Sequence, residues 1–142
     1  MVSILSGLVG GFVATIVMTG FMMSMGDDSP PPTARLWSKY VGSGEPTQYM
    51  MQGMALHFVY GIIAGGVFAA IGLGLGLGIG TLAGGLLWGV IWGLVLFVIG
   101  AAFWMMMVLG MNPDRKMAMG FGVFHIVYGL VLGAWVGYGI LG

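Results

Sequence analysis

The stretch "LLWGVIWGLVLFVIGAAFWMMM" (residues 86–107) contains no charged side chain in 22 consecutive residues. At a rise of 1.5 Å per residue, a helix of this length spans about 33 Å, slightly more than the hydrocarbon core of a bilayer. Backbone N–H and C=O groups cannot remain unpaired in lipid, and the strands of a barrel would be shorter and would alternate polar with apolar residues. The stretch therefore predicts a membrane-spanning helix.

The composition of the whole chain agrees with this prediction. The chain has 142 residues, of which 59% are hydrophobic and 6% charged, whereas soluble domains are about 25% charged. Four basic residues balance four acidic ones, so there is no basic surface to neutralise the phosphates of nucleic acid. The absence of cysteine excludes disulfides and thiolate metal sites. The composition therefore predicts a membrane protein and argues against nucleic acid as a partner.

Four apolar stretches are long enough to cross a bilayer, and they cover residues 2–25, 50–72, 81–109 and 117–141. The first has no basic residues before it and no small-x-small cleavage site at its end, so we interpret it as a retained helix rather than a signal peptide. The sequence thus predicts an all-α, polytopic membrane protein with one transmembrane domain over residues 1–142.

All charged side chains fall in two connections, residues 26–49 and 111–116. With four spans, both connections lie on the same side of the membrane, and the positive-inside rule places that side in the cytoplasm. Both termini are then expected outside the cell membrane. The opposite connection, "GLGLGLGIGT" (72–81), has no charge and is expected to form a flexible turn.

The first connection also carries a short amphipathic pattern, "PPPTARLWSKYVG" (30–42). In a helix its apolar residues form one stripe, which consists of Leu36, Trp37, Tyr40 and Val41. The proline run before it and the glycines after it would end the helix at both sides. We expect this helix to lie on the membrane surface.

One phrase occurs twice: "HFVYGIIAG" (57–65) and "HIVYGLVLG" (125–133) both read H-x-V-Y-G-x-x-x-G, and they contain the only two histidines. If the second and fourth helices start near residues 50 and 117, both imidazoles lie about 10–12 Å along their helices. The repeat predicts two helical hairpins, residues 1–72 and 81–142, related as a parallel internal repeat.

Small-xxx-small spacing, of the GxxxG type, occurs in all four predicted helices and allows two backbones to approach closely. We interpret it mainly as helix packing and homodimerisation, although some of these glycines would also make room for a planar cofactor. The residues are Gly7 and Gly11, Gly61 and Gly65, Gly85, Gly89 and Gly93, and Gly129, Gly133 and Gly137.

The histidine pair permits three interpretations. Each imidazole could hydrogen bond to a neighbouring helix, which is a purely structural role. Alternatively, His57 and His125 could supply the two axial ligands of a b-type haem, since they lie at one depth on diagonal helices of a bundle. As the only ionisable groups within the spans, they could also serve proton-coupled transport.

In the haem interpretation, further residues gain a role. Tyr60 and Tyr128 follow the histidines by one turn and are expected to help orient them. Arg115 and Lys116, together with Arg35 and Lys39, are the cations that could meet the haem propionates. A zinc site would need additional ligands, and no carboxylate or cysteine lies near the pair in the sequence.

Enzymatic motifs are missing from the sequence. No serine, histidine and carboxylate can be placed at one depth, and the glycine-rich turn lacks the lysine of a phosphate-binding loop. We expect a non-enzymatic protein that acts as a homo-oligomer or as an accessory subunit of a larger membrane complex. The competing hypothesis is a small pore or transporter for ions or small molecules, formed by a homo-oligomer.

The opening "GLVGGFVATIVMTGFMM" (7–23), together with the two repeated phrases, resembles a family of small four-helix integral membrane proteins found mainly in haloarchaea. The resemblance covers nearly the whole chain. It implies the four-helix topology, and it implies no activity or ligand.

Overall fold

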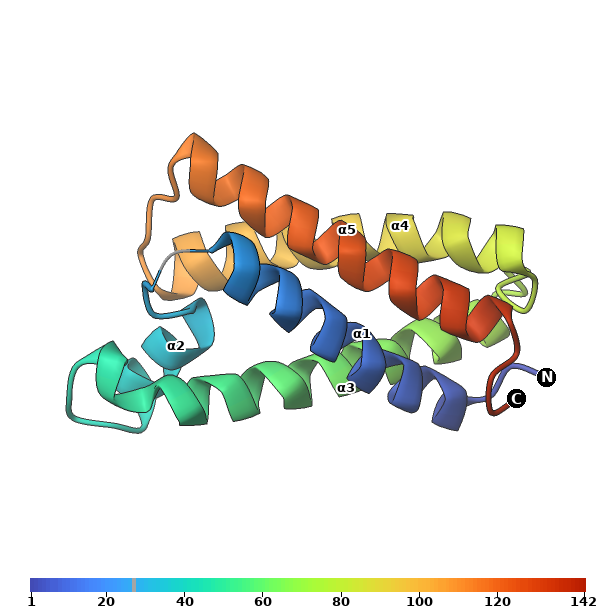
Figure 1. The fold of residues 1–142 in the computed structure, drawn as a ribbon, viewed down its shortest axis with the longest axis horizontal. Coiled ribbons are helices and arrows are strands. Elements are labelled where there is room, and N and C mark those ends of the chain that lie inside the picture. Colours follow the sequence, from blue (N-terminus) through green and yellow to red (C-terminus); the bar gives the residue numbers. More distant parts are fainter. Residues whose placement is uncertain (27) are drawn as a thin grey trace.

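The computed structural model describes residues 1–26 and 28–142, and this part of the chain forms helices and no strands. The helices are α1 (Ile4–Met25), α2 (Pro32–Tyr40), the 3-10 turn η1 (Pro46–Tyr49), α3 (Met50–Gly74), α4 (Leu82–Val98), η2 (Ile99–Val108) and α5 (Arg115–Gly137) (Figure 1). The spans α1, η1–α3, α4–η2 and α5 are each long and apolar enough to cross a membrane. The prediction of an all-helical protein with four such helices is confirmed.

The fourth long helix begins earlier than predicted, at residue 115 rather than 117. The side chain of Asp114 accepts a hydrogen bond from the backbone N–H of Met117 and so caps the first turn. Arg115 and Lys116 therefore belong to the helix rather than to the connection. The same helix ends at Gly137 instead of 141, where the chain turns through Gly139 with φ of 70°.

The third long helix changes from an α-helix to a π-helix part of the way along its length. Residues Leu82–Val98 are α-helical, whereas Ile99–Val108 form a π-helix that continues directly from it. The backbone N–H of Leu109 bonds to the carbonyl of Trp104, five residues earlier, as this wider helix requires. π-helical segments are rare and often occur at functional sites.

The four long helices form a bundle that is closed on one side and splayed on the other. α1 packs against both α3 and α5, and α4 packs against α5. α3 and α4 meet where the rings of Phe68 and Trp92 lie 6.2 Å apart. Figure 1 shows that α3 and α4 are close at the end that holds both chain termini, which we call the terminus end, and diverge toward the end that holds α2, which we call the α2 end.

Glycines set the distance between the helices of each hairpin. Between α1 and α3, a Cβ on Gly11 would lie 2.5 Å from the carbonyl oxygen of Gly61, so only a glycine fits there. Between α4 and α5, a Cβ on Gly89 would collide with the carbonyl oxygen of Gly129, and the reverse also holds. The two backbones of each hairpin are therefore in direct contact, as in other helix pairs with small residues at the interface.

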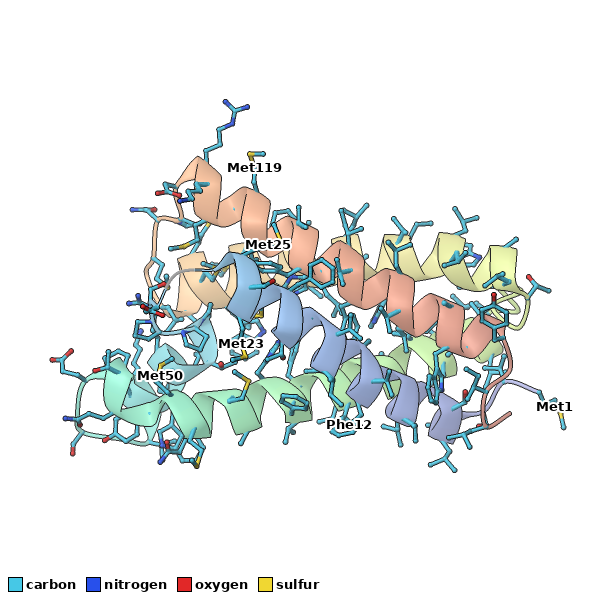
Figure 2. The ribbon with its side chains drawn as sticks, in the orientation of Figure 1. Met1, Phe12, Met23, Met25, Met50 and Met119 are labelled. Atoms are coloured by element: carbon cyan, nitrogen blue, oxygen red, sulfur yellow. The ribbon has the colours of Figure 1, made fainter. Side chains whose placement is uncertain are left out.

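The outer surface of the bundle is apolar. Large hydrophobic side chains are exposed along every long helix, including Phe12 on α1 and Met119 on α5, which point away from the bundle in Figure 2. A soluble monomer rarely exposes so much contiguous apolar surface, whereas lipid tails solvate it without cost. The surface, like the four long apolar helices, is that of a membrane protein.

Helix α2 spans the open α2 end of the bundle. Ala34 is fully buried against α3, where a Cβ on Gly53 would lie 2.6 Å from the Cα of Ala34. On the opposite side, the ammonium group of Lys39 donates a hydrogen bond to the carbonyl of Val108, at the end of η2. α2 therefore bridges the two helices that diverge.

Candidate ligand-binding site

The divergence of α3 from α4 leaves a cavity of about 360 Å³ inside the half of the bundle nearest α2. All four long helices contribute to its walls, with Thr15 from α1, Gly61 from α3, Leu96 from α4 and Phe121 from α5 among them. α2 closes one end and contributes Pro32, Thr33, Leu36, Trp37 and Tyr40, together with Val41, which follows it. The stripe predicted to face the membrane surface therefore lines this cavity.

Both histidines line the cavity, one from each hairpin. His57 on α3 is half-buried, and His125 on α5 is 6% exposed. The sequence repeat thus corresponds to two imidazoles that share one cavity in the structure.

The orientation of His125 is fixed by its own helix. Its Nδ1 lies 2.7 Å from the carbonyl oxygen of Phe121, one turn earlier. A carbonyl oxygen can only accept, so Nδ1 carries the hydrogen and Nε2 keeps its lone pair. The ring of Phe121 also packs edge-on against the imidazole, with 4.3 Å between centroids. Backbone carbonyls commonly orient metal-binding imidazoles in this way.

The absence of a side chain at Gly100 leaves room for the ring of Phe121 beside His125. A Cβ on Gly100 would lie 3.9 Å from Nε2 of His125 and would press on the ring of Phe121. Gly100 belongs to the π-helix η2 and also lines the cavity. Gly100 therefore allows the ring of Phe121 to pack close to the η2 backbone beside His125.

The two tyrosines of the repeat both line the cavity. The hydroxyl of Tyr128 donates to the carbonyl of Gly61 at 2.5 Å and so ties α5 to α3. Tyr60 also lines the cavity, near the indole of Trp104 on η2. The bond of Tyr128 holds the cavity wall and does not run to an imidazole.

The predicted propionate partners lie outside the cavity. Arg115 and Lys116 are exposed on the first turn of α5 and do not line it. The basic residues on the helix that closes the cavity are Arg35 and Lys39, which donate to the carbonyls of Pro30 and Val108. Arg35 and Lys39 therefore lie closer to the cavity than Arg115 and Lys116 do.

The predicted glycines lie mostly in the helix contacts. Of the ten, Gly61 also lines the cavity. Gly7, Gly11, Gly61 and Gly65 lie between α1 and α3, and Gly85, Gly89, Gly93, Gly129, Gly133 and Gly137 lie between α4 and α5.

Several cavity residues escaped the sequence analysis because nothing in their spacing marks them. Trp104 and Phe121 are apolar residues in apolar helices, and their role follows only from the path of η2 and α5. The hydroxyl of Thr33 lines the cavity too, and among the described residues it is a buried group without a hydrogen-bond partner. A proline run just before a helix gives no indication that the next residue reaches a cavity.

The cavity offers two imidazoles, several aromatic rings and few other polar groups. Among residues 1–26 and 28–142, no group of three or more His, Asp, Glu or Cys side chains is placed to hold a metal ion. The pair is therefore suited to a ligand that brings its own remaining coordination or that needs only hydrogen bonds and apolar contact. Comparison of the chain with protein-family models, with curated proteins and with solved structures finds no match.

Proposed function

We propose that the chain is a non-enzymatic integral membrane protein whose cavity binds a planar ligand between His57 and His125, and that this ligand is b-type haem. The observation that carries the proposal is the hydrogen bond from Nδ1 of His125 to Phe121, in a cavity that His57 shares. That bond leaves Nε2 of His125 free as a ligand atom. A porphyrin supplies four of the ligands of its iron, so two imidazoles complete the coordination.

The other cavity residues suit a flat, largely apolar ring. Trp37, Trp104 and Phe121 contribute aromatic rings to the cavity wall. The carboxylates of a haem would lie toward α2, where Lys39 and Arg35 are the nearest predicted cations. Bound haem supplies one-electron chemistry at its iron, while the protein holds the ring and excludes water. The absorption spectrum of the purified protein, with and without added haem, tests the assignment.

The proposal includes a topology in which the predicted connections 26–49 and 111–116 face the cytoplasm, α2 lies at the cytoplasmic surface, and the hairpins 1–72 and 81–142 form a parallel repeat. The support is that equivalent glycines meet in both hairpins. In the first hairpin Gly7 faces Gly65 and Gly11 faces Gly61, and in the second Gly85 faces Gly133 and Gly89 faces Gly129. A parallel repeat places both histidine phrases on helices that run outward.

Cysteine labelling is expected to show this topology directly. Because the chain has no native cysteine, Ser43→Cys and Leu77→Cys each provide one reactive thiol without background. In intact cells, a membrane-impermeant maleimide should label position 77 and should label position 43 only after permeabilisation. Labelling of position 43 alone in intact cells would mean that the orientation is inverted.

We further propose that the protein works as a homo-oligomer or as a subunit of a membrane complex. The chain has 142 residues and exposes large apolar side chains on every long helix. Mass measurement in nanodiscs is expected to give a species heavier than one chain of 14.8 kDa, after the mass of lipid is subtracted. A monomer at every lipid and protein concentration would contradict this proposal. Ion flux through liposomes containing the pure protein would instead favour the homo-oligomeric pore.

A further inference from the structure

The two seams between the hairpins differ. The seam between α1 and α5 is filled, since a Cβ on Gly10 would lie 2.8 Å from the ring of Trp135. At the terminus end of this seam, the hydroxyl of Ser6 donates a hydrogen bond to the carbonyl oxygen of Ile140 at 2.7 Å. The opposite seam, between α3 and α4, is held at Phe68 and Trp92 and widens from there toward α2 (Figure 1). The bundle is therefore open along one side only.

A groove of about 210 Å³ lies in that open seam. Its lining comes from α3 and α4, and it consists of Tyr60, Ile63, Ala64, Val67, Trp92 and Leu96. Tyr60, Ala64 and Leu96 also line the histidine cavity, so they form the boundary that the two spaces share. Ile63 is 56% exposed and Val67 is 40% exposed, which places the other side of the groove at the lipid-facing surface.

At the α2 end, the cavity is bordered by α2 and by the exposed side chains of Tyr40 and Val41. α2 lies across it, held to α3 at Ala34 and Gly53 and to η2 by the hydrogen bond from Lys39 to Val108. A ligand from water would have to pass this helix and the exposed side chains at its C-terminal end. A ligand from the bilayer meets only apolar side chains at the mouth of the groove.

We propose that the cavity exchanges its ligand with the lipid phase through the α3–α4 groove, so that the ligand is a membrane-soluble ring compound. That the cavity binds a ligand at all is taken from the proposed function. The route by which the ligand enters is inferred from the groove alone. Haem belongs to this class, because its ring partitions into bilayers while its carboxylates stay near the surface. A strongly hydrated ligand does not, because apart from the side chains of Tyr60 and Trp92 the groove is lined by apolar residues that cannot replace its hydration.

A fluorescent label tests the route without any ligand. Leu56 lines the cavity, and Leu56→Cys provides a single thiol for a bimane label. In liposomes, lipids with brominated acyl chains should quench the label, and aqueous iodide should not. Adding Ala64→Phe places a ring where the cavity meets the groove and should remove most of the quenching by lipid.

Two further variants control for indirect effects. Ala70→Phe adds the same ring to an exposed position of α3 away from the groove, and it should leave the quenching unchanged. Val67→Phe narrows the groove at its lipid mouth instead of at its boundary with the cavity. It should repeat the effect of Ala64→Phe if the latter variant fails to fold.

Haem transfer provides a second measurement. When apo-protein in liposomes is mixed with haem-loaded liposomes, Val67→Phe, which lies in the groove but not in the cavity, should slow the appearance of the bound spectrum about tenfold, which corresponds to an added barrier of about 1.4 kcal/mol. The final amount bound should remain close to that of the wild type. Ala70→Phe, which lies outside both the cavity and the groove, should not change the transfer rate.

The outcomes separate the route from the identity of the ligand. Quenching by iodide rather than by lipid, or a transfer rate in Val67→Phe equal to that of the wild type, overturns the lipid route and leaves haem binding intact. Quenching by lipid in a protein that binds no haem overturns the haem assignment and leaves the route intact.

Discussion

Alanine at either His57 or His125 is expected to abolish the Soret band that the wild-type protein shows with bound haem. The two imidazoles come from different helices and share one cavity, so neither can replace the other as an axial ligand. The wild-type band should shift on reduction, and both variants should lose it even when excess haem is added. Absorption spectra of the three proteins, purified and reconstituted in parallel, make the measurement.

Tyr128→Phe is the matched control for this experiment. It removes the hydrogen bond to Gly61 from the same cavity wall but leaves both imidazoles in place. The variant should keep the haem spectrum and lose about 1 kcal/mol of unfolding free energy. If the wild-type protein neither copurifies with haem nor takes it up, the haem proposal is wrong. In that case His57→Ala and His125→Ala should each cost only about 1–2 kcal/mol, as expected for the loss of a structural hydrogen bond.

Gly89→Ala is expected to destabilise the protein by about 1–3 kcal/mol or more, although it adds a single methyl group. The new Cβ would collide with the carbonyl oxygen of Gly129, and a backbone atom cannot move aside as a flexible side chain can. The two helices would therefore have to separate along their length. Unfolding of the protein in mixed micelles, with SDS as denaturant, measures the loss of free energy.

Gly20→Ala provides the comparison, because Gly20 is also helical but has no atom within 4 Å of the position that a Cβ would take. This variant should be as stable as the wild type or more stable by about 0.5–1 kcal/mol, because alanine loses less backbone entropy in a helix. Equal effects of Gly20→Ala and Gly89→Ala would show that helix propensity, rather than contact between backbones, explains the glycines.

The long helices could be predicted from sequence because bilayer thickness imposes a length on each apolar run. The predicted ends failed where a polar group acts locally. Arg115 and Lys116 appear as loop residues by their charge, but the cap formed by Asp114 draws them into the first turn of α5. A hydropathy profile reflects the charge of each side chain, but it does not detect the hydrogen bond that caps the first turn of a helix.

The candidate site was only partly predictable. The repeat placed His57 and His125 at a similar depth, but the cavity between them exists because α3 and α4 diverge while α1 and α5 do not. The apolar stripe of α2 is equally suited to a membrane surface and to a cavity, so its pattern could not distinguish the two. Nothing in the sequence around Trp104 indicates that it lines a cavity, because its position there depends on the wider turns of η2.

The π-helical segment has a consequence for how related chains would align with this one. In Ile99–Val108 each turn contains more residues than an α-helical turn, so a chain shorter by one residue there could reach the same connection with a regular α-helix. An insertion or deletion within an apolar span is hard to notice, because neighbouring residues are chemically alike. An alignment without a gap in this segment would match Gly100 or Trp104 with residues on a different face of the helix. For this span, the number of residues is as informative as their identity.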